Sequence, residues 1–459
     1  MAAPVRSPEW WRDKLLPKLD EQARYADFYQ RYYDGRFPDY GIVTDKYREA
    51  FAGMLRCIQD NWMQLVVDAQ AERMHVTGFR FGDDPEADTD AWMMWQRNHL
   101  DSDSGLAHTT ALICGKAFVL VAPGSDGPVM TVEHPTQMIV ACDPGNRRIR
   151  QAALKRWVDD WTGATNVTLY LPDGLHRWSD DAVTASRWGR KDRWREGDPT
   201  PNPLGVVPVI PLLNRPTLFG AGRSELEAVT STQDQINKLV CDMIVGSEFQ
   251  AYQQRWGTGL ELDIDPQTGE KINPFTHGQD RIWANPEPDG RFGAFPTADL
   301  GTYPKLLENR IQSIASRTRT PPHYMLGQTG QFPSGESLKA TETGLIAKAR
   351  AEMRHLEEGW EEAERLAFRI VGDPRSDEFA AETIWEDPES RTESEHVDAL
   401  VKKLTIGVPM QQLWEDAGYS PQQIARFKTM AVEEALNRAI GMGTPAPVEQ
   451  PAPPAPAVT

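Results

Sequence analysis

The chain has 459 residues and a formal net charge of −18 at pH 7, with 67 acidic and 49 basic side chains. Its composition, 40% hydrophobic and 25% charged, is that of an ordinary globular protein with roughly two or three packed units. A protein that grips DNA by neutralising phosphates needs positive charge, so tight DNA binding by the whole chain is disfavoured. An acidic surface past which DNA slides is compatible with this charge.

The cysteines and the lengths of the apolar runs indicate the cellular compartment expected for the protein. Cys57, Cys114, Cys142 and Cys241 are scattered without the CxxC spacing of a zinc site, so we expect buried, reduced thiols in a cytoplasmic protein. No apolar run approaches the roughly 20 residues that span a bilayer, and residues 1–19 lack the apolar region of a secretion signal. Neither secretion nor membrane insertion is therefore expected.

Helical patterns open the chain. Residues 1–75 are predicted to be helical, because apolar side chains recur at three- and four-residue steps over 47–74. Residues 90–122 are predicted as a helix, with Trp92 and Trp95 on one face, that continues into a buried strand.

Strand patterns follow over residues 129–215. Short segments at 129–132, 149–157 and 166–171 are separated by turn dipeptides that contain Gly, Pro and Asp. Prolines within 206–213 favour an edge strand or a loop, because proline cannot donate to a sheet ladder.

Two further helices are predicted in the middle of the chain. The first covers 224–250, where Ser224 and Glu227 have the spacing of a capping box before an apolar stripe. The second covers 302–318. The intervening residues, 256–301, are rich in Gly, Pro and Asp and are predicted as a compact β excursion.

That β excursion has two short candidate strands, at 260–264 and 281–284. After the second helix comes a loop of glycine, proline and polar residues over 321–335.

The longest helix is predicted from about Glu336 to Val371. Its acidic cluster, 357–364, is interpreted as the solvent face that an amphipathic helix needs. The functional alternative is a subunit contact with basic side chains of a neighbour, such as Arg350, Arg354 or Arg365.

Short helices and a biased tail close the chain. Residues 396–440 are predicted as three short helices, broken at 407–409 and at 418–421. The tail, 444–459, is low in complexity and is predicted to be extended, polyproline-like and disordered.

Catalytic motifs are missing from the sequence. Gly115-Lys116 lacks the upstream glycine and the following Ser or Thr of a Walker A loop, and HExxH, GxSxG and GxGxxG patterns do not occur. We interpret the acidic pairs as surface charge in turns, and not as metal ligands. These pairs are Asp83-Asp84, Asp159-Asp160 and Asp180-Asp181.

Aromatic side chains give one weak pointer to nucleic acid. Basic residues do not cluster around most of the 15 tryptophans, which are predicted to pack in cores and subunit interfaces. The run 187–195 is the exception, since it alternates Trp with Arg and Lys. It fits a phosphate contact, but also an exposed hairpin or a contact with an acidic surface of another subunit.

The order helix, small β excursion, helix, Gly-rich loop, long helix resembles the portal family of tailed phages, in particular the siphophage portals of Gram-positive hosts. The motifs that carry the resemblance span most of residues 215–425. They are Phe219-Gly220, Ser224-Glu225-Leu226, the run from Arg319 to Gly327, the run from Pro333 to Ala340, the run from Trp385 to Pro388, Arg391-Thr392-Glu393 and the run from Gly418 to Pro421.

The resemblance implies an α+β portal fold with a mixed α/β wing, a two-helix stem, a small β clip, a long wing helix and a helical C-terminal crown. The implied boundaries are the wing at 1–223, stem helices at 224–250 and 302–318, the clip at 251–301, a tunnel-side loop at 319–337, the long wing helix at 338–372, the crown at 373–443 and the tail at 444–459.

It also implies a function without catalysis or cofactors. Portal subunits form a ring, twelve-fold in this family, at one capsid vertex, through which double-stranded DNA is packaged, retained and ejected. The implied partners are the terminase large subunit, a head-completion or adaptor protein, and the major capsid and scaffolding proteins. The protein would assemble in the host cytoplasm and reside in the virion.

Candidate site residues follow from these assignments. Charges at helix ends need no special role, so the basic residues near the tunnel loop are equally read as ordinary helix-end charges. The candidate DNA-facing residues are Arg317, Arg319, Gln328, Gln331 and Lys339. The candidate clip contacts are Asp263, Asp265, Lys271, Arg281 and Trp283.

Two other classes remain open. One is a structural capsid or head–tail component through which no DNA passes. The other is a metal-dependent nuclease that uses the acidic pairs, for which no motif speaks.

Overall fold

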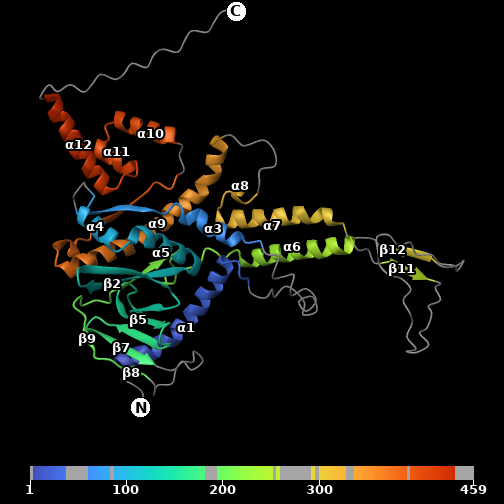
Figure 1. Ribbon diagram of the computed structural model, residues 1–459, viewed down its shortest axis with the longest axis horizontal. Helices are drawn as coiled ribbons and strands as arrows, with labels where there is room; N and C mark the ends of the chain where they lie inside the picture. Colours follow the sequence, from blue (N-terminus) through green and yellow to red (C-terminus); the bar gives the residue numbers. More distant parts are fainter. Residues whose placement is uncertain are drawn as a thin grey trace, which may run out of the picture. The chain divides into compact units, whose positions relative to one another are not determined.

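The computed structural model forms two compact units, one built from residues 1–34, 63–227 and 333–459 and the other from 35–62 and 228–332 (Figure 1). Both helices and strands are present, as an α+β fold requires. The structure describes residues 4–37, 60–82, 87–180, 194–251, 255–258, 291–294, 299–326, 335–389 and 393–439.

Helices of the first unit come from both ends of the chain. They are α1 (Pro8–Tyr33), α3 (Trp62–Ala71), α4 (Thr89–Arg97), α5 (Leu100–Cys114), α9 (Gly335–Val371), the short η4 (Pro374–Asp377), α10 (Glu393–Thr405), α11 (Met410–Asp416) and α12 (Pro421–Ala439). The long helix and the three short C-terminal helices are therefore confirmed. Within the stretch 47–74 that was predicted as helical, α3 confirms 62–71, and residues 47–59 lie outside the described residues.

The single helix predicted from residue 90 is wrong, because the structure divides it into α4 and α5. His99 has a left-handed backbone, with φ of 56°, and this conformation ends one helical path and starts another. Trp92 and Trp95 do share a buried face of α4, where their rings stack with centroids 6.2 Å apart.

Strands of the first unit form antiparallel sheets. They are β1 (Val76–Phe81), β2 (Lys116–Gly124), β3 (Gly127–Glu133), β4 (Met138–Cys142), β5 (Arg150–Val158), β6 (Thr165–Tyr170), β7 (Gly174–Asp180), β8 (Arg195–Glu196), β9 (Thr200–Pro201), β10 (Val209–Leu213) and β13 (Ala381–Trp385). Their orders are β1-β13, β10-β2-β3, and β4-β5-β6-β7-β8 with β9 beside β7. The strand β10 is an edge strand, as its prolines predict.

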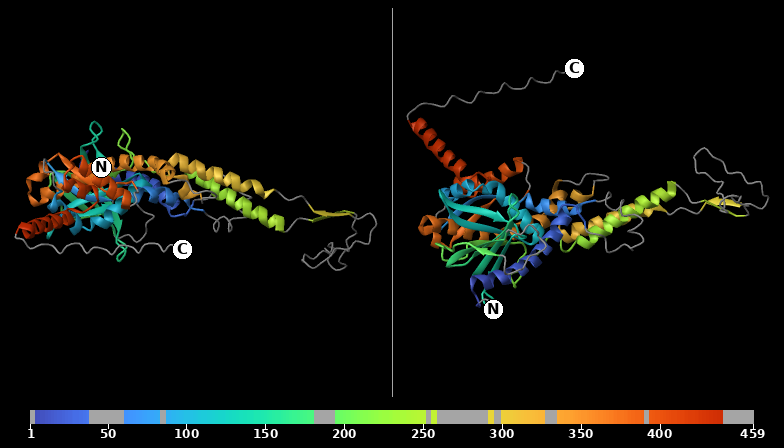
Figure 2. Two further views of the ribbon diagram at one scale, coloured as in Figure 1. Left: turned by 90° about the horizontal axis from the view of Figure 1, so that it is seen from above. Right: turned by 60° about the horizontal axis from the view of Figure 1, so that its bottom comes forward.

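The six-stranded sheet separates two apolar cores, because successive strand residues point to opposite faces. On one face Ala152 and Leu154 of β5 pack with Leu15 and Leu19 of α1. On the other, Ala153 packs with Phe118 of β2. The helix α1 accordingly lies along this sheet in both views of Figure 2.

The helix α9 packs on the three-stranded sheet β10-β2-β3. The close approach depends on Gly359, where an added Cβ would lie 2.5 Å from Cδ2 of Leu212 on β10. A second close approach joins Gly115 to Gly222, since a Cβ on Gly222 would lie 1.8 Å from the carbonyl oxygen of Gly115.

The second unit is a helical hairpin. Its elements are α6 (Thr230–Ala251), β11 (Arg255–Thr258), β12 (Arg291–Ala294), η3 (Leu300–Thr302), α7 (Tyr303–Thr318) and α8 (Pro322–Met325). The helices α6 and α7 run side by side in Figures 1 and 2, and β11 pairs with β12 in antiparallel register. The strands predicted at 260–264 and 281–284 lie outside the described residues.

The helix predicted from Ser224 begins six residues later. The Ser224 hydroxyl accepts from the N–H of Leu226, at 3.1 Å, and so forms a local turn instead of a helix cap. The next residue, Glu225, is fixed in the first unit by Lys348, whose Nζ lies 2.6 Å from its carboxylate. The local sequence does not reveal this buried ion pair with a distant residue, and the helix begins only at Thr230.

Candidate functional site

The helices α6 and α7 share an apolar seam that includes Ile236, Val240, Ile311, Ile314 and Ala315, all buried. The helix α6 also buries two amides. The Oε1 of Gln233 accepts from the N–H of Trp62 at 3.2 Å, and the Oδ1 of Asn237 accepts from the N–H of Asp60 at 3.1 Å. These amides tie residues 60–62 to the hairpin.

The opposite face of α7 is exposed and carries both signs of charge. Lys305 and Glu308 lie there beside Leu306, which is 47% exposed. Arg310 is also exposed but reaches α6, where it donates to Oε1 of Gln235 at 3.3 Å. A helix covered on one side alone presents a free surface to a partner or to solvent.

The C-terminal end of α7 brings together two predicted tunnel residues. Arg317 and Arg319 are both exposed there. Arg317 donates to the carbonyl of Ala228 at 3.1 Å, and Arg319 caps the helix in a left-handed conformation with φ of 58°. Arg317 thus has a structural partner, in addition to any role toward DNA.

The remaining predicted site residues are not brought together by the structure. Lys339 is on α9 in the first unit, where it lines a cavity of about 420 Å³ with Glu342 and Arg350. Gln328 and Gln331 lie outside the described residues. So do all of the candidate clip contacts, Asp263, Asp265, Lys271, Arg281 and Trp283.

The acidic cluster of α9 forms the predicted solvent face only in part, since Glu358 is exposed but other members are not. Glu361 and Glu364 are buried, the latter 1% exposed. Burial raises the pKa of Glu361 to about 7, and it raises the pKa of Glu364 well above the usual value for a glutamate. Earlier on the same helix, burial raises the pKa of Glu352 to about 8. Sequence reasoning missed these residues, because a glutamate on a helix reads as solvated whichever element packs above it.

The basic side chains proposed to meet those glutamates in a neighbour contact their own chain. Arg350 pairs with Asp387 at 3.0 Å, and the guanidinium of Arg365 lies over the ring of Phe379. Glu362 is paired with Arg150. Apart from the exposed Glu358, the glutamates of the cluster therefore lie within or against the interior of the first unit.

A buried histidine sits against α9. Nε1 of Trp360 donates to Nε2 of His108 at 2.9 Å, so Nδ1 must carry the histidine proton, which it donates to the carbonyl of Met74 at 3.0 Å. Burial lowers the pKa of His108 to about 4 and keeps the ring neutral. These two hydrogen bonds fix the orientation of the histidine ring in the packed interior, and they leave neither ring nitrogen available for proton transfer.

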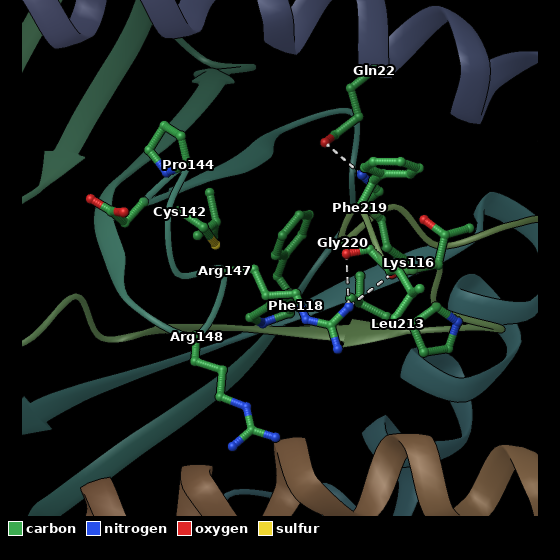
Figure 3. Close-up of a pocket in the computed structure, with 16 residues that line it drawn as sticks. Gln22, Lys116, Phe118, Cys142, Pro144, Arg147, Arg148, Leu213, Phe219 and Gly220 are labelled. Atoms are coloured by element: carbon green, nitrogen blue, oxygen red, sulfur yellow. Dashed lines mark hydrogen bonds between the residues drawn. The ribbon is translucent and has the colours of Figure 1, made fainter.

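A cationic pocket opens between α1, the β4–β5 turn and the loop 216–220 (Figure 3). Its volume is about 580 Å³, and Lys116, Arg147 and Arg148 contribute positive charge to its lining. Arg147 donates to the carbonyls of Thr217 and Leu218, at 3.1 and 3.0 Å, and so fixes the loop. No sequence motif pointed to this pocket, because its residues come from four separate segments.

The structure bears on the remaining sequence predictions. Cys114 and Cys241 are buried free thiols, as expected, but Cys142 is exposed, because it ends an outer strand beside the cationic pocket. Cys57 lies outside the described residues. Asp159 accepts from the N–H groups of Trp161 and Thr162, which is the turn role predicted for it.

The basic-aromatic run 187–195 is described only from Trp194 onward. Trp194 packs against the apolar core that contains Leu15 and Leu19 of α1, and the guanidinium of Arg12 lies 5.9 Å from the centre of the Trp194 ring. Within the described ranges, groups of His, Cys, Asp and Glu suited to a metal ion do not occur. Among the described helices, none combines the length and apolar character needed to cross a membrane.

Comparison with known proteins agrees with this architecture. Residues 12–434 match the family of phage portal proteins of the SPP1 Gp6-like type. The portal protein of Mycobacterium phage L5 is 29% identical over 461 residues, which cover 96% of this chain and 91% of that protein. The portal protein of Mycobacterium phage D29 is 29% identical over 460 residues, with the same shares covered.

The match spans the sheets of the first unit, the α6–α7 hairpin and the C-terminal helices alike. The resemblance inferred from the motifs is thereby confirmed, and the chain belongs to the phage portal protein family, whose members are oligomeric structural components of the virion capsid and not enzymes.

Proposed function

We propose that this chain is one subunit of a closed ring at a capsid vertex, through whose central channel double-stranded DNA is packaged, retained and ejected. The observation that carries the proposal is the half-covered α6–α7 hairpin. One side of α7 packs on α6, while Lys305 and Glu308 leave its other side polar and exposed. A polar face of mixed charge suits a wet channel wall, and the net charge of −18 disfavours adhesion of DNA.

In this proposal the earlier assignments keep their roles. The hairpin α6–α7 is the stem, residues 251–301 are the clip that docks the terminase large subunit and later a head-completion or adaptor protein, and residues 319–337 form the tunnel-side loop. Residues 1–223 and α9 form the wing, and residues 373–443 form the crown. The major capsid and scaffolding proteins would meet the ring during assembly in the host cytoplasm.

The crown supports assembly of several copies. Val397, Val401 and Leu404 of α10 are 44–53% exposed and follow one helical stripe. With Leu413 and Trp414 of α11 they line an apolar groove of about 340 Å³. Exposed apolar stripes on adjacent helices mark a surface that is covered by another protein surface, and a ring supplies a neighbour at every subunit.

Electron microscopy and native mass spectrometry of the purified full chain test the proposal. We expect closed rings with a central hole, whose mass divided by 51.6 kDa gives the subunit number, for which we expect twelve. Persistently monomeric chains, in the presence of scaffolding and capsid proteins, would contradict it.

A second measurement separates the portal from a capsid component without DNA passage. Deleting residues 327–334 from the tunnel-side loop should leave rings intact and impair DNA packaging or retention in assembled particles. Normal packaging by the deletion variant would favour the other structural role.

A further inference from the structure

The cationic pocket has more positive charge than its own unit neutralises. Asp143 is the acidic residue in its lining. Its Oδ1 accepts from the N–H groups of Gly145 and Asn146, at 2.7 and 3.1 Å, and its Oδ2 accepts from Nε2 of Gln151 at 2.5 Å. This carboxylate therefore stabilises its own turn and does not pair with the pocket's cations.

Lys116 and Arg148 keep capacity for an anion. The Nζ of Lys116 donates to Oε1 of Gln22 at 3.3 Å, and no described carboxylate pairs with it. Burial lowers the pKa of Lys116, so an anion beside it would stabilise its charged form. Arg148 is exposed, and no described carboxylate pairs with it. In Figure 3 its side chain extends outward from the rim of the pocket, away from Lys116 and Phe118.

The rest of the pocket is apolar. Phe118, Val140 and Leu213 line it, and Leu218 and Phe219 stand on the loop 216–220 with 86% and 97% of their surfaces exposed. Figure 3 shows Phe219 on the same side of the pocket as Lys116. Side chains this exposed gain stability when a partner covers them. A matching ligand thus combines a carboxylate with apolar side chains, which a protein segment does and a DNA backbone does not.

We propose that, in the ring, this pocket receives an acidic, partly apolar segment of the adjacent copy of the same chain. The inference rests on the proposed ring function. A ring interface joins two different surfaces of one subunit, so each copy can offer the pocket on one side and the segment on the other. Chains of net charge −18 repel one another, and a local cationic pocket converts part of that repulsion into attraction at one defined register.

Cys142 reports on occupancy, because it is exposed and lines the pocket, whereas Cys114 and Cys241 are buried internal references. The full chain would be alkylated with a maleimide as DNA-free rings and as separated subunits, and each cysteine quantified by peptide mass spectrometry. We expect Cys142 to react about tenfold or more slowly in rings, because a buried interface excludes the reagent.

Rings in which Cys142 reacts as fast as in separated subunits would overturn this inference and leave the proposed function intact. Protection that arises only when DNA is added would assign the pocket to nucleic acid and would also overturn it. Absence of rings would overturn the proposed function, and this inference with it.

Charge reversal gives an independent readout. Arg148→Glu should raise the subunit concentration for half-assembly by about tenfold and increase its sensitivity to salt, since a favourable charge pair becomes a repulsive one. Arg148→Lys keeps the charge and should assemble normally. Arg369→Glu, at an exposed arginine of α9 that does not line the pocket, is the matched control. Equal effects of both reversals, or no effect of Arg148→Glu, would overturn the proposal.

Discussion

The helices α9 and α7 carry apolar residues at the same helical spacing, but they use their polar faces differently. The helix α9 contacts β2, β3, β10 and β13, and it buries Glu352, Glu361 and Glu364. The helix α7 packs mainly on α6, and its polar face stays exposed. Helical periodicity therefore identifies the apolar face, whereas the neighbouring elements decide whether the other face meets solvent.

The largest contrast should come from truncating one apolar side chain on each helix. Trp360→Ala on α9 should lower the free energy of unfolding by about 3–5 kcal/mol, because it opens a cavity and leaves Nε2 of His108 without a donor. Leu306→Ala on α7, where the side chain is half exposed, should cost about 1 kcal/mol or less. Urea unfolding measures both. Similar losses of unfolding free energy in the two variants would contradict the difference in burial between the two helices.

The buried carboxyl of Glu352 on α9 makes the free energy of unfolding depend on pH. Because its folded pKa is about 8 and its ordinary value is 4.5, the folded chain holds a proton that the unfolded chain loses, and stability falls as the pH rises from 4.5 to 8. Glu352→Gln removes this loss and should gain stability on the order of 3 kcal/mol over the wild type between pH 5 and pH 8. Exposed Glu358→Gln, the control, should show no such trend. If the difference in stability between Glu352→Gln and the wild type stayed constant from pH 5 to pH 8, it would contradict the burial of Glu352 in its protonated form.

The buried amide of Gln233 on α6 connects the hairpin to residues 60–62. Gln233→Leu should cost about 1–3 kcal/mol, because the amide of Gln233 binds the N–H of Trp62 and the carbonyl of Asp60. Hydrogen exchange at the amide of Trp62 should speed up accordingly. Gln235→Leu, at an exposed position on the same helix, should leave that exchange unchanged. Unchanged exchange in Gln233→Leu would show that residues 60–62 are held otherwise.

The smallest effects come from a matched pair of helical glycines. Gly359→Ala should lose about 1–3 kcal/mol, because its Cβ would meet Leu212 within the packed face of α9. Gly105→Ala on α5 has open space within 4 Å and should gain roughly 0.5–1 kcal/mol from helix propensity. Thermal unfolding resolves the two signs. A gain at Gly359 would mean that α9 tolerates a wider approach to the sheet.

Much of the fold was predictable where a local pattern carried the signal. The helix over 335–371, the three C-terminal helices and the edge position of β10 all follow from spacing, glycine and proline. The pairing of β1 with β13 was not predictable, since its partners, such as Phe79 and Thr383, lie some three hundred residues apart. The predicted start of α6 was wrong for the same reason, because an ion pair between Glu225 and the distant Lys348 overrides a local capping signal.

The candidate site divides in the same way. Arg317 and Arg319 were identified through the family resemblance and both lie at one helix end, whereas the pocket around Lys116 assembles from strands and loops that no motif links. Family membership also followed from the sequence, because ordered motifs survive where overall identity is low.

Local pattern and composition suffice to predict the periodic helices, the acidic character and the portal family of this chain. The burial of particular glutamates on α9, the exposure of Cys142 and the three cations that line an apolar pocket became visible in the folded chain alone. Those properties depend on contacts between distant segments, and the desolvation that they impose is invisible in any single stretch of chain.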